Sequence, residues 1–168
     1  MAKKTVAKCR HWLMKTEPSE FSIDDLVASP KQTTFWFGVR NYQARNLLRD
    51  EIKVGDRVLF YHSSCEAPAV VGTAVVVRGG YPDHTALDPN SPYFDAKSSP
   101  DNPRWYMVDI RLDQKLARPV TITEMRAHQE LVDLPLLRKG NRLSVLPVTH
   151  AEFEYVLKLA NRPIRPAD

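Results

Sequence analysis

The chain has 168 residues, 43% of them hydrophobic, and a mean hydropathy of −0.39, which predicts one domain with a packed core and excludes a disordered chain. No apolar run is long enough to span a bilayer, and no apolar segment follows the basic residues at the start, so a membrane protein is excluded and secretion is not expected. The net charge of +4 permits a polyanionic partner without requiring one.

The first predicted elements are a strand and a short helix. HWLMKT (His11–Thr16) alternates loosely between polar and apolar residues, which favours a strand, and Pro18 ends it. Ser22, followed by acidic residues, resembles a helix N-terminus, and Pro30 ends that helix.

An extended segment and a second helix follow. TTFWF (Thr33–Phe37) is β-branched and aromatic, which predicts extended backbone, and Gly38 interrupts it. Asn41 is a suitable N-cap for a helix. The apolar face of that helix recurs with the helical period at Ala44, Leu47 and Leu48.

Two strands are predicted in the centre of the chain. The first contains Val58 and Phe60, follows a turn at 54–56, and ends at Tyr61-His62. The second, Ala69–Val77, is almost entirely small or β-branched, which is typical of a strand buried on both faces.

The stretch from Pro82 to Arg104 has no hydrophobic period and holds five of the 13 prolines. A loop of this length in a small domain is usually functional or mobile. We refer to it as the proline-rich loop.

The C-terminal part returns to regular patterns. Trp105–Leu112 alternates and predicts a strand, and Arg142–Val148 predicts another. Thr121–Glu124 and Thr149–Glu152 both have the capping-box pattern that begins a helix. The second of these helices has an apolar stripe at Phe153, Val156, Leu157 and Ala160.

About five strands with short helices between them, and no linker or internal repeat, predict an α+β fold. We expect a single domain built round a small, strongly bent sheet or barrel. The two cysteines, Cys9 and Cys65, are too few for a disulfide framework. We therefore expect an intracellular protein, cytoplasmic or nuclear.

Neither a metal site nor a nucleotide-binding motif stands out. The sequence lacks a phosphate-binding glycine loop, a GxSxG elbow and the zinc-deaminase signature. The acidic and histidine residues of the proline-rich loop match no known metal spacing, and we expect a solvated loop there. These residues are Asp83, His84, Asp88, Asp95 and Asp101.

The segment that best suits catalysis is Tyr61-His62-Ser63-Ser64-Cys65. His62 could activate Cys65 or Ser63 as a nucleophile, in an enzyme that acts on a nucleotide or small molecule. Consecutive strand residues point to alternate faces, so the segment equally fits a strand end with a half-buried histidine and an inert cysteine.

The surroundings of Trp36 suit a ligand. The helix N-terminus predicted at Asn41 offers free backbone N–H groups for an anion such as phosphate, and an aromatic face beside it suits a stacked base. A packing role for Trp36 and a simple capping role for Asn41 explain the same residues. At two other strand ends, Glu17 could accept a hydrogen bond from a base amino group, and Lys15 or Arg142 could donate to carbonyl or phosphate oxygen.

Long motifs of this sequence resemble the EVE-domain family: HWLMKTEP, W-F-GVRNYQARN, VLFYHSS, the YPD-x-TALDP loop and KGNRLSVLPVT, in this order. The resemblance extends from about His11 to about Leu157. It implies a PUA-like fold, which is a small mixed β-barrel or bent sheet with short helices around it. We accordingly expect one domain at 11–160, a basic tail at 1–10 and a C-terminal tail at 161–168.

The resemblance also implies a function, because EVE domains are regarded as readers of modified bases in DNA or RNA. We therefore expect a non-catalytic, monomeric module that binds nucleic acid, needs no cofactor or metal, and contacts no membrane. YTH domains of the same superfamily have a Lys, a Ser or Thr at a strand end and a later cage Trp, similar to Lys15, Thr16 and Trp36 here. The EVE motifs add Glu17, Gly38, Val39, Arg40, Asn41, Tyr61, His62, Arg142 and Ser144.

In this hypothesis Trp36 stacks on a base flipped out of its strand, and Gly38 lets the protein backbone come close. Arg40, Asn41 and the helix N-terminus then hold the sugar–phosphate or the base edge. The further aromatic residues of a YTH cage have no counterpart that the motifs match. A modified cytosine therefore fits the expected pocket as well as methylated adenine, or better.

Overall fold

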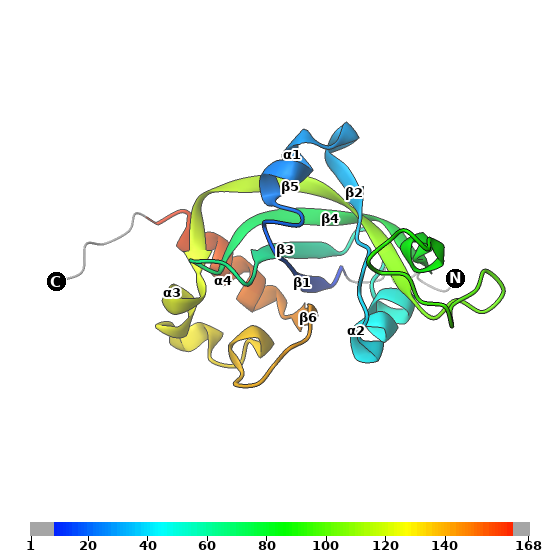
Figure 1. Ribbon diagram of the computed structural model, residues 1–168. Helices are drawn as coiled ribbons and strands as arrows, with labels where there is room; N and C mark the ends of the chain where they lie inside the picture. Colours follow the sequence, from blue (N-terminus) through cyan, green and yellow to red (C-terminus); the bar gives the residue numbers. More distant parts are fainter. Residues whose placement is uncertain (1–8, 163–168) are drawn as a thin grey trace, which may run out of the picture.

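The computed structural model describes residues 9–162 (Figure 1). Of the two predicted tails, 1–10 and 161–168, all but residues 9–10 and 161–162 lie outside the described residues. No helix in the described range is long and apolar enough to cross a membrane.

Within residues 9–162, six strands form one mixed sheet in the order β2-β5-β4-β3-β1-β6. Strands β1 and β3 are parallel and the other pairs are antiparallel. Within the described residues β2 and β6 are the two edges and do not pair with each other, so the sheet is bent rather than closed into a barrel. The strands are β1 His11–Thr16, β2 Thr33–Phe35, β3 Arg57–His62, β4 Ala69–Pro82, β5 Tyr106–Thr121 and β6 Val145–Val148.

The bend of the sheet is concentrated in its two longest strands, β4 and β5. Their pairing shifts register at four places along its length. Each shift inserts unpaired backbone into one strand, which increases the local twist and bends the strand. In Figure 1 these strands arch across the whole molecule.

Four α-helices flank the sheet, and each begins at a predicted cap. Ser22 and Thr149 form full capping boxes, whereas the side chains of Asn41 and Thr121 each accept one backbone hydrogen bond. The box predicted at Thr121 is incomplete because Glu124 pairs instead with Arg118, 2.6 Å away. The helices are α1 Ile23–Ala28, α2 Tyr42–Asn46, α3 Ile122–Arg126 and α4 His150–Ala160; a π-type turn at Leu47–Glu51 continues α2.

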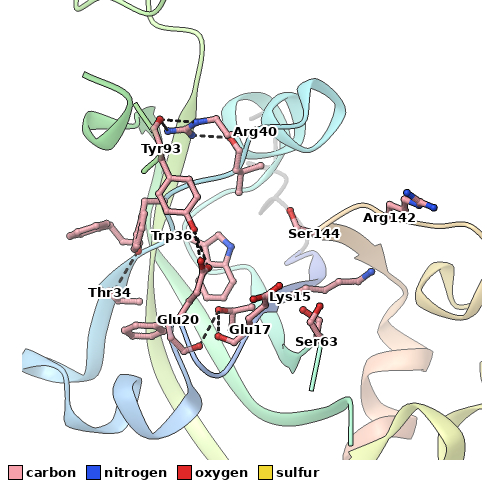
Figure 2. Close-up of a pocket in the computed structure, with 17 residues that line it drawn as sticks. Lys15, Glu17, Glu20, Thr34, Trp36, Arg40, Ser63, Tyr93, Arg142 and Ser144 are labelled. Atoms are coloured by element: carbon pink, nitrogen blue, oxygen red, sulfur yellow. Dashed lines mark hydrogen bonds between the residues drawn. The ribbon is translucent and has the colours of Figure 1, made fainter. Parts of the chain in front are cut away.

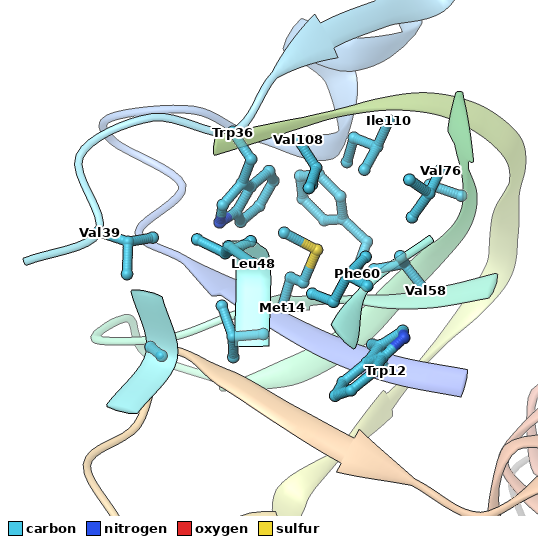
Figure 3. Packing of buried hydrophobic residues seen from close by; sticks show 14 of the residues in the cluster. Trp12, Met14, Trp36, Val39, Leu48, Val58, Phe60, Val76, Val108 and Ile110 are labelled. Carbon is cyan, nitrogen blue, oxygen red and sulfur yellow. The ribbon is translucent and has the colours of Figure 1, made fainter. Parts of the chain in front are cut away.

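Alternation along the strands divides the core into two layers. Trp12, Met14 and Phe60 face the layer covered by α1 and α2 (Figure 3), which also contains Trp36. Leu13 lies on the opposite face of the sheet, in the second layer, which α4 covers. Leu59 and Tyr61 of β3 belong to the same layer. Because the period is two, neighbouring residues of one strand serve different layers.

Three strand boundaries differ from the sequence prediction by three or more residues. Strand β4 continues to Pro82, five residues beyond Val77. Strand β5 continues for nine residues beyond Leu112, to Thr121. In that extension only Leu116 and Val120 are buried, so the local pattern is too polar to indicate a strand, and pairing with β4 supplies the stability. Strand β6 begins at Val145 rather than Arg142.

Candidate nucleic-acid-binding pocket

A cavity of about 380 Å³ opens where β1 ends, beside the segment that follows β2 (Figure 2). The proline-rich loop and the segment before β6 complete its walls. Nine of the twelve predicted site residues line it: Lys15, Thr16, Glu17, Trp36, Gly38, Val39, Arg40, Arg142 and Ser144.

Eight further residues line the cavity without having been predicted as ligand-binding residues. Some are sequence neighbours of predicted residues, and this proximity was a signal that could have found them. Tyr93 is different, because it comes from the proline-rich loop, where no period marks any position. The eight are Glu20, Phe21, Thr34, Phe35, Phe37, Ser63, Ser64 and Tyr93.

Trp36 serves the core and the cavity at once. Only 7% of its surface is exposed, and its ring meets Phe60 edge-on with 5.5 Å between centroids. Its backbone N–H donates to the carbonyl oxygen of Val108 on β5 at 2.8 Å. The indole is therefore held rigidly, and it forms one wall of the cavity.

The polar edge of the cavity is formed by the end of β1. Lys15 is half-buried, and burial lowers the pKa of its ammonium group. Its backbone N–H donates to the Ser144 carbonyl oxygen at 2.8 Å, which fixes the strand end. Glu17 is exposed, and none of the ion pairs among residues 9–162 involves Lys15 or Glu17. Both charges are thus available to a ligand.

Arg40 is occupied by the protein itself. Its guanidinium group donates to Asp83 at 3.0 Å and twice to the Tyr93 carbonyl oxygen, at 2.6 and 3.2 Å. Asp83 also accepts from the Gly38 backbone N–H at 2.9 Å. Arg40 therefore fastens the proline-rich loop to the cavity wall, which differs from its predicted role on a sugar–phosphate.

The carboxylate of Asp83 is buried but well satisfied. Burial alone would raise the pKa of Asp83, but hydrogen bonds from Thr85, Gly38 and Arg40 outweigh this effect and hold the pKa below its usual range. The group is therefore charged near neutral pH.

Gly38 has a different purpose from the predicted one. Its φ of +81° favours glycine, and a Cβ atom at this position would lie 2.9 Å from the ring of Tyr93. The missing side chain thus makes room for Tyr93 rather than for a ligand.

Tyr93 bridges two walls of the cavity. Its hydroxyl group donates to the Glu20 carboxylate, 3.0 Å from either oxygen. Burial and this hydrogen bond raise the pKa of Tyr93, which keeps the hydroxyl protonated. Figure 2 shows this bridge on one side of Trp36, with Lys15 and Arg142 on the other.

Three predicted site residues lie outside the cavity. The Asn41 side chain accepts from the Ala44 N–H at 3.0 Å, which caps the five-residue α2. Tyr61 faces the opposite layer of the core, where burial raises its pKa to about 12. His62 Nε2 accepts from the Ile23 N–H at 3.1 Å. The side-chain oxygen of Asn41 therefore has the capping role that the sequence also allowed.

The arrangement around His62 does not suit nucleophilic catalysis. Burial lowers the pKa of His62, so the ring is neutral, and an accepting Nε2 leaves the proton on Nδ1. Neither nitrogen is then free to take a proton. Cys65 Sγ lies 3.9 Å from the backbone carbonyl oxygen of His62. Ser63 lines the cavity, and its N–H donates to Thr16 at 2.9 Å.

No group of three or more His, Cys, Asp or Glu residues between 9 and 162 could hold a metal ion. Two of the acidic residues considered from the sequence instead accept hydrogen bonds within the protein. Asp83 binds the cavity wall, and Asp95 accepts from the Trp105 indole at 2.7 Å.

Comparisons with known proteins place these features in context. Human thymocyte nuclear protein 1 is 41% identical over 169 residues, covering 90% of this chain and 74% of that protein. A crystal structure of the human THYN1 protein in complex with 5-methylcytosine-containing DNA is 42% identical, with a TM-score of 0.86, and covers 92% of this chain and 99% of that chain.

Two more solved structures show how widely the fold extends. A Pseudomonas putida protein is 46% identical, with a TM-score of 0.85, over 89% of this chain and 99% of that chain. A Zygosaccharomyces rouxii YTH domain, solved with N6-methyladenosine RNA, shares the fold at 14% identity and a TM-score of 0.54, over 96% of this chain and 90% of that one. The family model of the EVE domain matches residues 10–159. The chain therefore belongs to the EVE-domain family.

Proposed function

We propose that this chain is a non-catalytic module that recognises a modified base, a modified cytosine, in nucleic acid. The observation that carries the proposal is the cavity beside Trp36. Its volume of about 380 Å³ lies at the small end of ligand sites, which suits one nucleobase with part of its sugar. It joins a rigid aromatic wall to two charged groups, Lys15 and Glu17, that form no ion pair with any other residue between 9 and 162.

The two charges match the Watson–Crick edge of cytosine. That edge presents an amino group at N4 and acceptors at N3 and O2. Glu17 would accept from the amino group, and Lys15 would donate to an acceptor. Thymine presents O4 in place of the amino group, which would set two acceptors against each other. The complex of the human THYN1 protein with 5-methylcytosine-containing DNA supports the choice of cytosine.

The wider assignments are also part of the proposal. The partner is DNA or RNA, the protein acts as a monomer, and its location is intracellular, either cytoplasmic or nuclear. The name of the thymocyte nuclear proteins supports the last of these. The enzyme alternative with His62 and either Cys65 or Ser63 is less favoured, because the His62 ring is already used to bind α1.

Fluorescence anisotropy with labelled oligonucleotides tests the proposal. Strands carrying cytosine, 5-methylcytosine, 5-hydroxymethylcytosine, thymine or N6-methyladenine at one position are compared, single and double, at two salt concentrations. We expect tighter binding to a modified cytosine. Lys15→Met should weaken binding to cytosine and to modified cytosine alike, about tenfold, because an acceptor on the captured base loses its donor and a buried polar group without its partner costs about 1–3 kcal/mol. Glu17→Gln should narrow the difference between the cytosines and thymine, because its amide can donate to O4.

Controls remove the same charges elsewhere. Lys158→Met on α4 and Glu66→Gln after β3 change exposed residues that do not line the cavity. They should leave the relative affinities for cytosine, modified cytosine and thymine unchanged. Binding that ignores the modification and collapses with salt would reduce the interaction to phosphate electrostatics and contradict the proposal.

A further inference from the structure

A row of aromatic side chains runs from the outer surface into the mouth of the cavity. His84 meets the ring of Phe35 with 5.0 Å between centroids, Phe35 meets Phe37 at 5.5 Å, and Phe37 meets Tyr93 at 5.5 Å. Phe35, Phe37 and Tyr93 all line the cavity. We call Phe35, Phe37 and His84 the aromatic rim.

The aromatic rim is more exposed than packing requires. Phe35 retains 40% and Phe37 38% of their surface. Trp36 lies between them in the chain and points inward, since alternate residues of extended backbone face opposite sides. Neighbouring apolar side chains exposed on an edge strand favour aggregation unless they serve a contact. The exposure therefore indicates a ligand.

We infer that the aromatic rim stacks on the bases that flank the captured base in the same nucleic-acid strand. The inference rests on the proposed function. Nucleotides are covalently joined, so a base held beside Trp36 necessarily brings its neighbours to the mouth of the cavity, where Phe35 and Phe37 are exposed. Withdrawing one base also removes a stacking partner from each neighbour, and an aromatic ring can replace it.

The chemistry of the surrounding groups favours a base over an apolar protein segment. The rim is continuous with a cavity whose far side presents Lys15 and Arg142, so a polyanion with planar apolar bases complements both parts. The rim contains no Lys, Arg, Asp or Glu, which suits sequence-tolerant stacking rather than reading of a base edge. The neighbours of the modified base are therefore expected to contribute affinity with little preference among them.

Oligonucleotides with abasic neighbours test this inference on the full chain. The probe is a labelled single strand with one 5-methylcytosine. A second strand has a tetrahydrofuran abasic residue on each side of the modified base. Loss of stacking should weaken wild-type binding about five- to 150-fold for each flanking base that stacks on the rim, from about 1–3 kcal/mol per stacked base. Equal affinity of the wild type for both strands would overturn the inference, and this comparison needs no variant.

Variants then assign the effect to the rim. A Phe35→Ser/Phe37→Ser protein should bind the intact strand as weakly as the wild type binds the abasic one, and should lose nothing more on the abasic strand. Phe94→Ser is the matched control, because Phe94 is 44% exposed and does not line the cavity. If the abasic neighbours weaken the double variant by the same factor as the wild type, the stacking lies elsewhere. That result would refute the assignment to the rim.

The same titrations separate this inference from the proposed function. A wild-type protein that distinguishes 5-methylcytosine from cytosine but ignores abasic neighbours supports the pocket and overturns the rim. A protein that binds none of the strands overturns both. If the rim instead docks a protein segment, the Phe35→Ser/Phe37→Ser protein should bind every oligonucleotide with the wild-type affinity.

Discussion

Replacing Asp83 with asparagine tests how the cavity wall is held to the proline-rich loop. The wild-type carboxylate is fully buried and accepts four hydrogen bonds. Two come from Thr85, at 2.8 and 2.6 Å, and one each from Gly38 and Arg40. An amide has only one oxygen, so two of these bonds are lost and an NH₂ group faces N–H or O–H donors.

The expected loss follows from these contacts. Hydrogen bonds to a charged group contribute about 1.5–3 kcal/mol each, and breaking a buried ion pair costs about 3–5 kcal/mol. Arg40 keeps its bonds to the Tyr93 carbonyl oxygen, and its side chain is 23% exposed, so its charge is not stranded. We therefore expect Asp83→Asn to lower the free energy of unfolding by about 2–4 kcal/mol.

Urea unfolding followed by tryptophan fluorescence measures this loss. Asp101→Asn, an exposed position in the same loop, is the control and should change the free energy of unfolding by less than about 0.5 kcal/mol. A similarly small change for Asp83→Asn would refute the structural role assigned to the carboxylate.

The pH dependence supplies an independent check. The folded-state pKa of Asp83 lies below its unfolded value of about 3.9, so the unfolded state binds the proton first as the pH falls. The contribution of Asp83 is fully present above that unfolded pKa and is lost as the pH falls through the folded-state pKa. The difference between wild type and Asp83→Asn should therefore narrow in acid, and a constant difference down to low pH would contradict this account.

Three further changes test other parts of the structure by the same unfolding assay. Gly38→Ala should cost about 1–2 kcal/mol from its left-handed backbone alone, and its new Cβ would displace the ring of Tyr93, which a shift in Trp36 fluorescence would reveal. Thr149→Ala should cost about 1 kcal/mol, because it removes the cap of α4; an unchanged urea midpoint would contradict this. His62→Ala should destabilise by about 1–3 kcal/mol by leaving the Ile23 N–H unpaired, while oligonucleotide binding by the folded protein stays intact; lost binding would return His62 to the site.

Local sequence patterns predicted those elements whose stability is itself local. Ser22 and Thr149 are capping residues whose hydrogen bonds act within one helical turn. The second half of β5 was missed for the opposite reason. Its residues are mostly exposed, and the strand persists there because β4 supplies backbone partners that no short window of sequence can reveal.

Of the twelve residues that the resemblance to the EVE family suggested, nine line the cavity. The resemblance gave each residue a position but not a hydrogen-bond partner. Arg40 and Gly38 line the cavity, yet their partners lie 43–53 residues away in the proline-rich loop. The alternation of strand residues alone could have excluded Tyr61 from the predicted cavity residues, since Tyr61 points to the opposite core layer from Phe60.

The last prediction separates the role of stacking on Trp36 from that of hydrogen bonds to Lys15 and Glu17. Flipping a base out of a duplex costs a few kcal/mol, and stacking returns about 1–3 kcal/mol per base for any base. Under the proposed function, stacking on Trp36 would supply affinity with little preference among bases, and Lys15 and Glu17 would supply the preference.

Trp36→Phe keeps an aromatic wall in the core while reducing the stacked area. We expect it to weaken binding to every base of the anisotropy panel by a similar factor and to leave their order unchanged. Glu17→Gln should instead change the order of the bases, because an amide can donate to the O4 of thymine where a carboxylate cannot. A Trp36→Phe protein with a changed order of bases, or a Glu17→Gln protein with the wild-type order, would mean that shape rather than hydrogen bonding selects the base.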